Sequence, residues 1–164
     1  MASETPVWVI RSGPTGSSVI DDFEANSLVA ISFLNFGVGT VVGLRADELK
    51  ATITAHRTDM TPGAISGAAS RLIRFAVDVA VGDIVISPGA DRVLVGRIAG
   101  DYEYSEQAPI DTYNHIRSVD WERSDARDQL PAGIRSGFRS RITIYQPAKP
   151  SSAHGSITRS KETH

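Results

Sequence analysis

The sequence predicts an α+β domain built as a small curled β-barrel of about five to six short strands with flanking helices. Segments with helical periodicity lie between short apolar runs in the first half of the chain, whereas strand-like patterns dominate the second half. A length of 164 residues with 41% hydrophobic residues suffices for one core and leaves little room for two domains.

The strands are predicted from short apolar or alternating runs that end at turn residues. The first, VWVI at residues 7–10, stops at the turn sequence RSGP. Apolar runs on both sides of the turn SPGAD at residues 87–91 predict a hairpin that continues into residues 101–104. Further strands are expected at residues 28–33, 113–121 and 141–145.

Helices are predicted where apolar residues recur at steps of three or four. Residues 46–57 carry one narrow apolar stripe. The clearest helix starts at Thr61, which can cap it, has Pro62 at its first position and continues to residue 79. Shorter helices are expected at residues 19–24 and 129–138, and a glycine-rich loop at residues 35–43.

One folded domain is expected at residues 7–146. Residues 1–6 are expected to be a flexible N-terminus, and residues 147–164 a disordered polar and basic tail, because this composition buries too little apolar surface to order itself.

The net charge is −2, yet residues 131–164 hold six basic side chains and one acidic one. Such a strip can attract phosphates, since salt limits each charge to a range of about 10 Å.

The composition also bounds the cellular setting. The chain has no cysteine, which excludes disulfides and thiolate zinc sites and fits a reducing compartment. Its apolar runs are far shorter than the roughly 18 residues of a membrane span, and its start has no signal-peptide pattern. We therefore expect a cytoplasmic protein without a membrane segment.

The candidates for catalysis are weak. Glu48 and Lys50 match one end of a metal-dependent nuclease signature but lie on a predicted helix, where that signature needs strands. Ser66, in GAISG, misses the nucleophile-elbow spacing, and the four histidines have no partner at zinc-ligand spacing. We expect no catalytic residue, no metal and no cofactor.

Aromatic residues at strand ends are more informative. Tyr102 and Tyr104 are two positions apart and should project from one face of a strand, with Asp101 and Glu103 on the other. Trp8 lies just before Arg11 on the first strand. Aromatic rings beside an arginine can sandwich a flat heterocycle and read its hydrogen-bonding edge, although composition alone favours Trp8 as a core residue.

Several segments together resemble a known family. They are VWVIRSG at residues 7–13, VAI at 29–31, IRF at 73–75, VGDIV at 81–85, VGRIAGDYEY at 95–104 and HIRSVDW at 115–121. In this combination the chain resembles the N-terminal specificity domain of Mrr-like restriction endonucleases, which is similar to the EVE and YTH modules of the PUA-like superfamily. The resemblance covers roughly residues 7–145.

The resemblance implies a DNA-binding reader that extrudes one nucleotide from the duplex and examines a modified base, often a cytosine derivative, in a pocket at the barrel mouth. It implies a role as the specificity module of a restriction or defence system, with any nuclease in another domain or subunit. The implied pocket residues are Trp8, Arg11, Ser12, Phe33, Ser66, Gly67, Pro88, Tyr102 and Tyr104. Ser32 and Phe33 stand where family members often have a tryptophan, and the turn at Pro88 is atypical.

Contacts with the DNA backbone are expected from arginines, because guanidinium groups bind phosphates bidentately. The candidates are Arg71, Arg74, Arg117, Arg139 and Arg141. Two alternatives stay open. The chain could bind RNA or a modified nucleotide, or it could be a nucleoside-modifying hydrolase with Asp101 or Glu103 as the acid or base.

Overall fold

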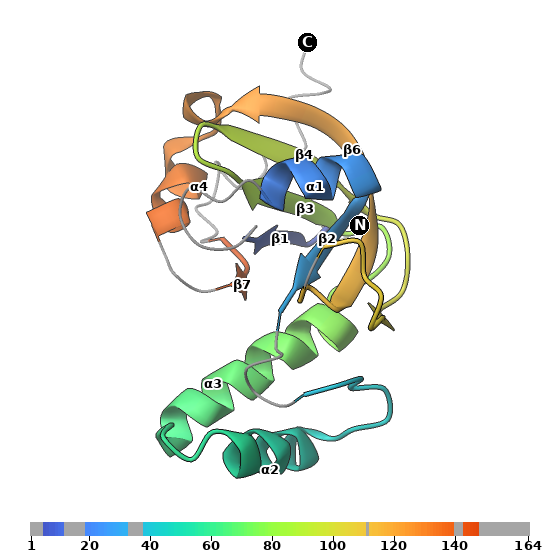
Figure 1. The fold of residues 1–164 in the computed structure, drawn as a ribbon. Coiled ribbons are helices and arrows are strands. Elements are labelled where there is room, and N and C mark those ends of the chain that lie inside the picture. Colours follow the sequence, from blue (N-terminus) through green and yellow to red (C-terminus); the bar gives the residue numbers. More distant parts are fainter. Residues whose placement is uncertain (1–4, 12–18, 33–37, 111, 140–142, 148–164) are drawn as a thin grey trace.

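The computed structural model is an α+β domain in which the strands form one curled sheet, a half-barrel, flanked by helices (Figure 1). The structure describes residues 5–11, 19–32, 38–110, 112–139 and 143–147. The predicted fold class is therefore confirmed. The expectations for residues 1–4 and 148–164 lie outside the described residues.

Within the described residues, seven strands make up the sheet, in the order β2-β6-β4-β3-β1-β7, with β5 paired to β6. Neighbouring strands are antiparallel except β1 and β3, which run parallel. The strands are β1 (Val7–Ile10), β2 (Leu28–Ile31), β3 (Ile84–Pro88), β4 (Arg92–Ile98), β5 (Glu103–Tyr104), β6 (His115–Ala126) and β7 (Ile144–Tyr145).

Four α-helices accompany the sheet in the described part of the chain. They are α1 (Val19–Asn26), α2 (Ala46–His56), α3 (Pro62–Ile73) and α4 (Ala132–Ser136). The helix α3 continues as a π-helical turn over Arg74–Asp78. None of the described helices is both long and apolar enough to cross a membrane.

The strand β1 is buried on both faces, which explains its unbroken apolar run. Val7 and Val9 belong to a cluster with Ile134 of α4, whereas Trp8 and Ile10 belong to the main core on the other face. Because α4 covers the second face, all four residues of the strand are buried. An alternating pattern would have left one face of β1 open to water.

The helices α2 and α3 form a hairpin that projects from one end of the curled sheet (Figure 1). The α2 stripe of Leu49 and Ile53 is fully buried. As predicted, Thr61 caps α3, its side chain accepting a hydrogen bond from the backbone N–H of Ala64 at 3.1 Å, and Pro62 follows it. The helical hairpin therefore forms a layer of its own beside the sheet, and the end of α3 contacts the sheet.

Two predictions in the second half of the chain need correction. Pro88 was expected in a turn but ends β3, where it is buried and pairs with Val93. A proline is tolerated at that place because it ends the strand and donates no ladder hydrogen bond there. The strand expected at residues 113–121 starts at His115 and continues to Ala126, because its outer half pairs with the full length of β4.

A glycine allows β4 and β6 to come close where the register between them shifts, between Val95 and Gly96. A Cβ atom on Gly96 would lie 2.8 Å from the Cα of Trp121 and would also overlap the carbonyl oxygen of Asp120. Both obstacles are backbone atoms of the partner strand, which cannot rotate away. The irregularity, which bends the sheet, requires glycine at this position.

We expect Gly96→Ala to lower the free energy of unfolding by about 2 kcal/mol or more, because the added methyl group must separate the two strands. Urea denaturation followed by circular dichroism measures this change. The control is Gly63→Ala in the first turn of α3, where a Cβ would meet nothing within 4 Å. That substitution should leave stability unchanged or raise it by about 0.5 kcal/mol. Equal stability of the two variants would contradict the packing argument.

Candidate functional site: a pocket between the sheet and the helical hairpin

A pocket of about 570 Å³ lies where the end of α3 meets the sheet. It is lined by the loop before α2 (residues 41–44), by the π-helical turn that continues α3 and the residues after it (residues 76, 77 and 79–81), and by Asp101, Tyr102 and Arg117. We call it the seam pocket. Its volume is in the range of small-molecule sites, which commonly lie between structural layers.

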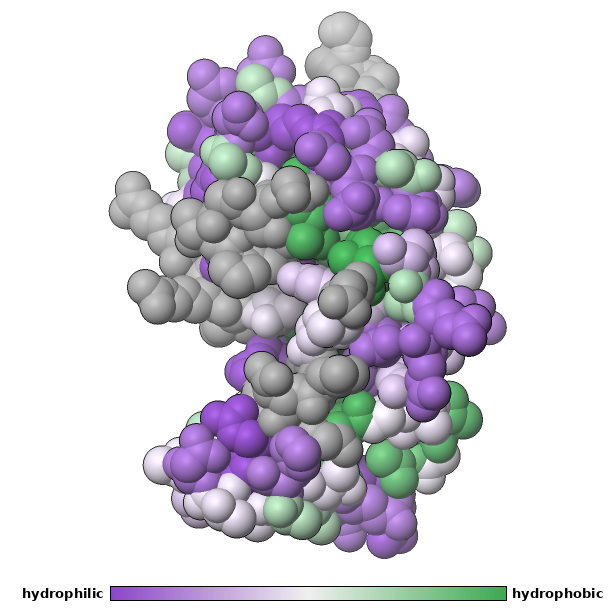
Figure 2. Space-filling view, viewed as in Figure 1, coloured by the Kyte–Doolittle hydropathy of each residue, from purple (hydrophilic) through white to green (hydrophobic). Residues whose placement is uncertain are grey.

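The rim of the seam pocket is unusually apolar for an exposed surface. Val42, Leu44, Val77 and Val81 are 73%, 40%, 69% and 56% exposed, and all four line the pocket. They include every large hydrophobic side chain that is exposed in the described part of the chain. Figure 2 shows hydrophobic surface in green over the loop that leads into α2. An apolar patch gathered around one opening marks a binding surface.

Arg117 of β6 lies at the floor of the pocket and is only 2% exposed. Its Nε donates a hydrogen bond to the carbonyl of Gly100 at 3.0 Å, and its Nη1 donates to the carbonyls of Phe75 at 2.9 Å and Val79 at 2.7 Å. Among the described residues, none accepts a hydrogen bond from Nη2, and no carboxylate forms an ion pair with this arginine. Nη2 is thus the end of the guanidinium left to face the pocket.

The charge on Arg117 is balanced only at a distance. Burial lowers the pKa of the guanidinium, while the carboxylates of Asp101 and Asp83 act to raise it. Asp101 lines the pocket and is exposed, whereas Asp83 is buried. A buried cation without a contacting anion carries a desolvation cost, which the three carbonyl contacts offset in part.

The wall formed by residues 79–83 is held by a buried carboxylate. Asp83 Oδ2 accepts hydrogen bonds from Trp8 Nε1 at 3.0 Å and from the backbone N–H of Ala80 at 2.9 Å. Trp8 is 6% exposed and belongs to the main core. This corrects the expectation that Trp8 borders a pocket: its ring is packed in the interior, and it supports the pocket wall through Asp83.

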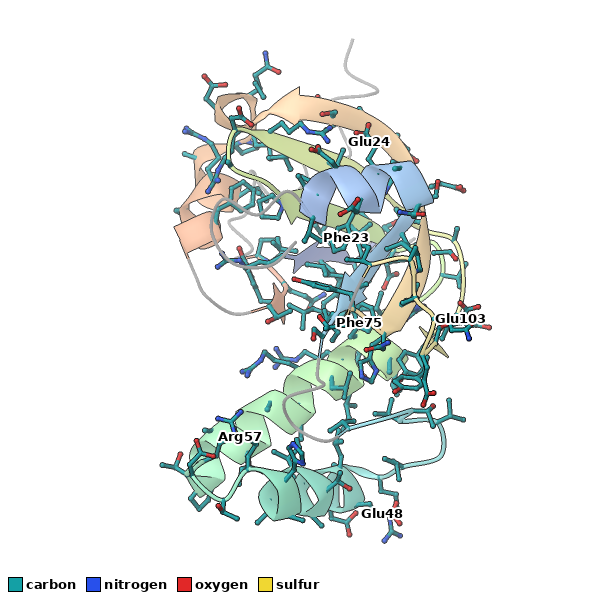
Figure 3. All side chains as sticks on the ribbon, in the orientation of Figure 1. Phe23, Glu24, Glu48, Arg57, Phe75 and Glu103 are labelled. Carbon is teal, nitrogen blue, oxygen red and sulfur yellow. The ribbon has the colours of Figure 1, made fainter. Side chains whose placement is uncertain are left out.

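Tyr102 connects the loop before α2 to the sheet. Its hydroxyl accepts a hydrogen bond from the backbone N–H of Val41 at 3.3 Å and lies 2.7 Å from Nδ1 of His115. The tautomer of His115 decides which of these two groups donates in the second contact. The ring of Tyr102 stacks on His115 at 5.9 Å and meets Phe75 edge-on at 6.4 Å. Figure 3 shows Phe75 at this junction of α3 and the sheet.

The two tyrosines do not form a slot for a ligand. As predicted, both rings lie on one face, but both contact His115, with the Tyr104 ring centroid 5.2 Å from the histidine ring. Glu103 between them points outward, as the alternation predicts (Figure 3). Tyr102 lines the seam pocket and Tyr104 does not. The site thus contains one of the two expected rings, and its walls are more aliphatic than expected.

A second feature, which we call the arginine face, lies on α3 and the turn that continues it. Gly67, Arg71 and Arg74 follow at steps of four and three and so share one face of the helix. Neither arginine forms an ion pair with any described residue. Burial lowers the pKa of Arg71, and the neighbouring charge of Arg74 lowers it further. Unpaired like charges side by side are typical of a surface that binds an anion.

The other predicted site residues lie in different parts of the molecule. Ser66 is exposed on α3, outside the seam pocket, and Gly67 makes room for Arg71, whose Nη1 would lie 3.3 Å from a Cβ there. Arg11 is half-buried at the end of β1, and Pro88 is buried in β3. Ser12, Phe33, Arg141 and the side chain of Arg139 lie outside the described residues.

Arg117 also differs from its expected role. It was predicted to contact a phosphate of the DNA backbone, but its burial and its three carbonyl partners exclude it from the outer surface. The apolar rim was not predicted at all. The signal available in the sequence was the run AVDVAV at residues 76–81, whose valines at 77 and 81 continue past the core-facing positions of α3.

The structure offers little for metal or acid–base chemistry. In the described ranges, no group of three His, Cys, Asp or Glu side chains is placed to hold a metal ion. Of the two acids considered for hydrolysis, Asp101 lies at the pocket and Glu103 does not. What the site offers a ligand is an apolar rim, one guanidinium end and one carboxylate.

Burial of His115 predicts a pH-dependent stability. Burial lowers the pKa of His115 from 6.5 to about 4, against an opposing hydrogen bond with the backbone of Val38. Because the unfolded chain takes up this proton at a higher pH than the folded chain, the contribution is complete above pH 6.5 and is lost as the pH falls toward 4. We expect a loss of up to about 3 kcal/mol in this interval.

Urea titrations at pH 7, 5.5 and 4 measure this dependence. His115→Gln should flatten the decline, whereas His56→Gln, at an exposed position on α2, should leave it unchanged. A slope that His115→Gln does not alter would assign the pH dependence to other groups.

Comparison with protein families and with curated proteins gives one match, to a family. Among curated proteins, none matches this chain. The family described as a domain of unknown function, DUF8426, matches residues 8–146, from the first strand past the last. Since this match spans most of the sequence and every described element of the sheet, the chain belongs to the DUF8426 family.

Proposed function

We propose that this chain is a non-catalytic, DNA-binding reader domain that holds one modified, cytosine-derived base in the seam pocket. The observation that carries the proposal is that every exposed large hydrophobic side chain of the described residues meets a buried guanidinium in one pocket. A flat heterocycle has the matching chemistry, with apolar faces for the rim and an acceptor edge for Arg117 Nη2.

The energetics of reading an extruded base suit such a pocket. Swinging a base out of a duplex costs a few kcal/mol. Stacking on a free aromatic ring contributes about 1 to 3 kcal/mol per base. Tyr102 is the ring that lines the pocket, and because it already stacks on His115, contact with it contributes part of this value. A methyl or larger substituent on the base gains a further 1 to 3 kcal/mol or so by filling apolar space, here beside Val77 and Val81. Discrimination then depends on the substituent and the base edge.

The arginine face supplies a place for the phosphates. Arg74 begins the π-helical turn that carries Val77 of the rim, so the unpaired arginines are close in the chain to the pocket lining. A strand whose base enters the pocket would carry its neighbouring phosphates across this face. The resemblance to Mrr-like specificity domains supports a cytoplasmic role in restriction or defence, with cleavage by a separate nuclease domain or subunit.

The first test blocks the pocket. We expect Val77→Asp to weaken binding to the preferred modified duplex about tenfold, which is about 1.4 kcal/mol, because a charge on the rim opposes entry of the base. Fluorescence anisotropy with duplexes that carry unmodified, methylated, hydroxymethylated or glucosylated cytosine measures the affinity. The control is Ala55→Asp, which adds the same charge at an exposed position on α2 away from the pocket.

If the two variants bind the modified duplex with equal affinity, the base does not bind in the seam pocket. Tighter competition by single-stranded RNA or by free nucleotides would favour the alternative of an RNA or nucleotide binder. Turnover of a modified nucleoside that is lost in Asp101→Asn would instead favour a hydrolase.

The second test concerns the arginine face. Each phosphate contact contributes about 0.9 to the slope of log K against log salt concentration. We expect the double variant Arg71→Gln/Arg74→Gln to reduce this slope by up to about 1.8. The control is Arg45→Gln, since Arg45 is also exposed but lies 3.4 Å from Asp47 in an ion pair. A slope that stays unchanged in the double variant would place the phosphates elsewhere.

A further inference from the structure

We propose that the ligand of the seam pocket carries a carboxylate on a planar ring with apolar faces, with the carboxylate bound at Nη2 of Arg117. This inference deepens the proposed function and rests on it for the use of the seam pocket as the ligand site. The shared chemistry has two sources, a carboxylated base within DNA and a free aromatic carboxylate, and the experiment below separates them.

The first support is the geometry of Arg117. Three backbone carbonyls orient Nε and Nη1, so the guanidinium cannot turn, and its remaining end faces the pocket. Arg117 is 2% exposed, yet Nη2 is not among the described buried polar atoms that lack a partner, so solvent or a ligand in the pocket can reach it. A carboxylate supplies both an acceptor and a negative charge, and a charge-assisted hydrogen bond is roughly twice as strong as a neutral one.

The second support is the amount of charge that the pocket can balance. Arg117 is the single cationic side chain that lines the pocket in the described part of the chain, and the hydroxyl of Tyr102 is engaged by Val41 and His115. Because Asp101 also lines the pocket, the site offers one guanidinium end and no surplus positive charge, whereas a phosphate would bring more negative charge and would need more donors than the site offers. A singly charged carboxylate is the better match.

The third support is the apolar rim. Val42, Leu44, Val77 and Val81 surround the opening, and a ligand that reaches Arg117 must place its body among them. A flat ring attached to the carboxylate satisfies both requirements. Asp101, which also lines the pocket, then disfavours the anion and sets how tightly it binds.

The experiment titrates the full-length protein with benzoate and with benzamide, its neutral isostere, by isothermal titration calorimetry. We expect benzoate to bind at least tenfold more tightly than benzamide. Asp101→Asn should tighten benzoate binding about threefold, because it removes a like charge from the pocket. Glu103→Gln is the matched control, since Glu103 is the exposed acid two residues on that does not line the pocket, and it should change nothing. Val77→Asp should abolish the binding.

Arg117 is not substituted in this test, because its replacement would leave three buried carbonyls without a hydrogen-bond donor. Benzamide binding as tightly as benzoate, or weaker benzoate binding in Asp101→Asn, would overturn the inference.

A second arm compares duplexes that carry 5-carboxylcytosine or 5-methylcytosine. Preference for the carboxylated duplex, lost in Val77→Asp, supports the inference with DNA as the source. If the protein binds benzoate but no duplex, the inference is supported with a free aromatic carboxylate as the ligand. In that case the proposed function as a DNA reader is wrong, whereas the carboxylate site is not. The third outcome is that the protein binds duplexes in a way that depends on Val77, but shows no preference for the carboxylated duplex and does not bind benzoate. This outcome overturns the inference and is consistent with the proposed function.

Discussion

The junction between the sheet and the helical hairpin depends on one buried guanidinium. Arg117 extends from β6 and donates hydrogen bonds to the carbonyls of Phe75 and Val79, near the end of α3, and of Gly100, in the connection after β4. Helix ends leave carbonyls without partners inside the helix, and a cation there is also favoured by the helix dipole. The same contacts that join two layers thus form the floor of the seam pocket.

The form of the helix end explains why the pocket has an apolar rim. The turn Arg74–Asp78 is π-helical, a widened turn that often occurs at functional sites. Within it, Phe75 is fully buried and Val77, two positions on, is 69% exposed, so this turn carries both a core residue and a rim residue. Asp83 then holds the following turn through Ala80. Rigid supports behind an exposed apolar surface favour binding, because the surface is ordered before the ligand arrives.

The opposite wall depends on a different kind of contact. Tyr102 links the loop before α2 to the sheet through Val41 and His115, and His115 stays neutral because burial lowers its pKa to about 4. Neutral hydrogen bonds therefore hold the wall at Tyr102, whereas the charged guanidinium of Arg117 holds the floor of the seam pocket. Arg71 and Arg74 of the arginine face form no ion pair with any described residue, so their charges are available to a partner.

The sequence by itself determined the elements, because hydrophobic period, caps and turns are local properties. The apolar run of β1 and the Thr61–Pro62 start of α3 were both predicted from neighbouring residues alone. Only the tertiary structure decided the site, because burial depends on residues far apart in the chain. The alternation of β6 places Arg117 on the same face as Val119, and both are buried, but an arginine was expected to bind phosphate from the surface. Only the fold brings to it the carbonyls about 40 residues earlier that accept its hydrogen bonds. Hydrogen bonds between residues far apart in the chain leave no periodic pattern, and so the partners that hold Arg117 at the floor of the pocket could not be predicted from the sequence.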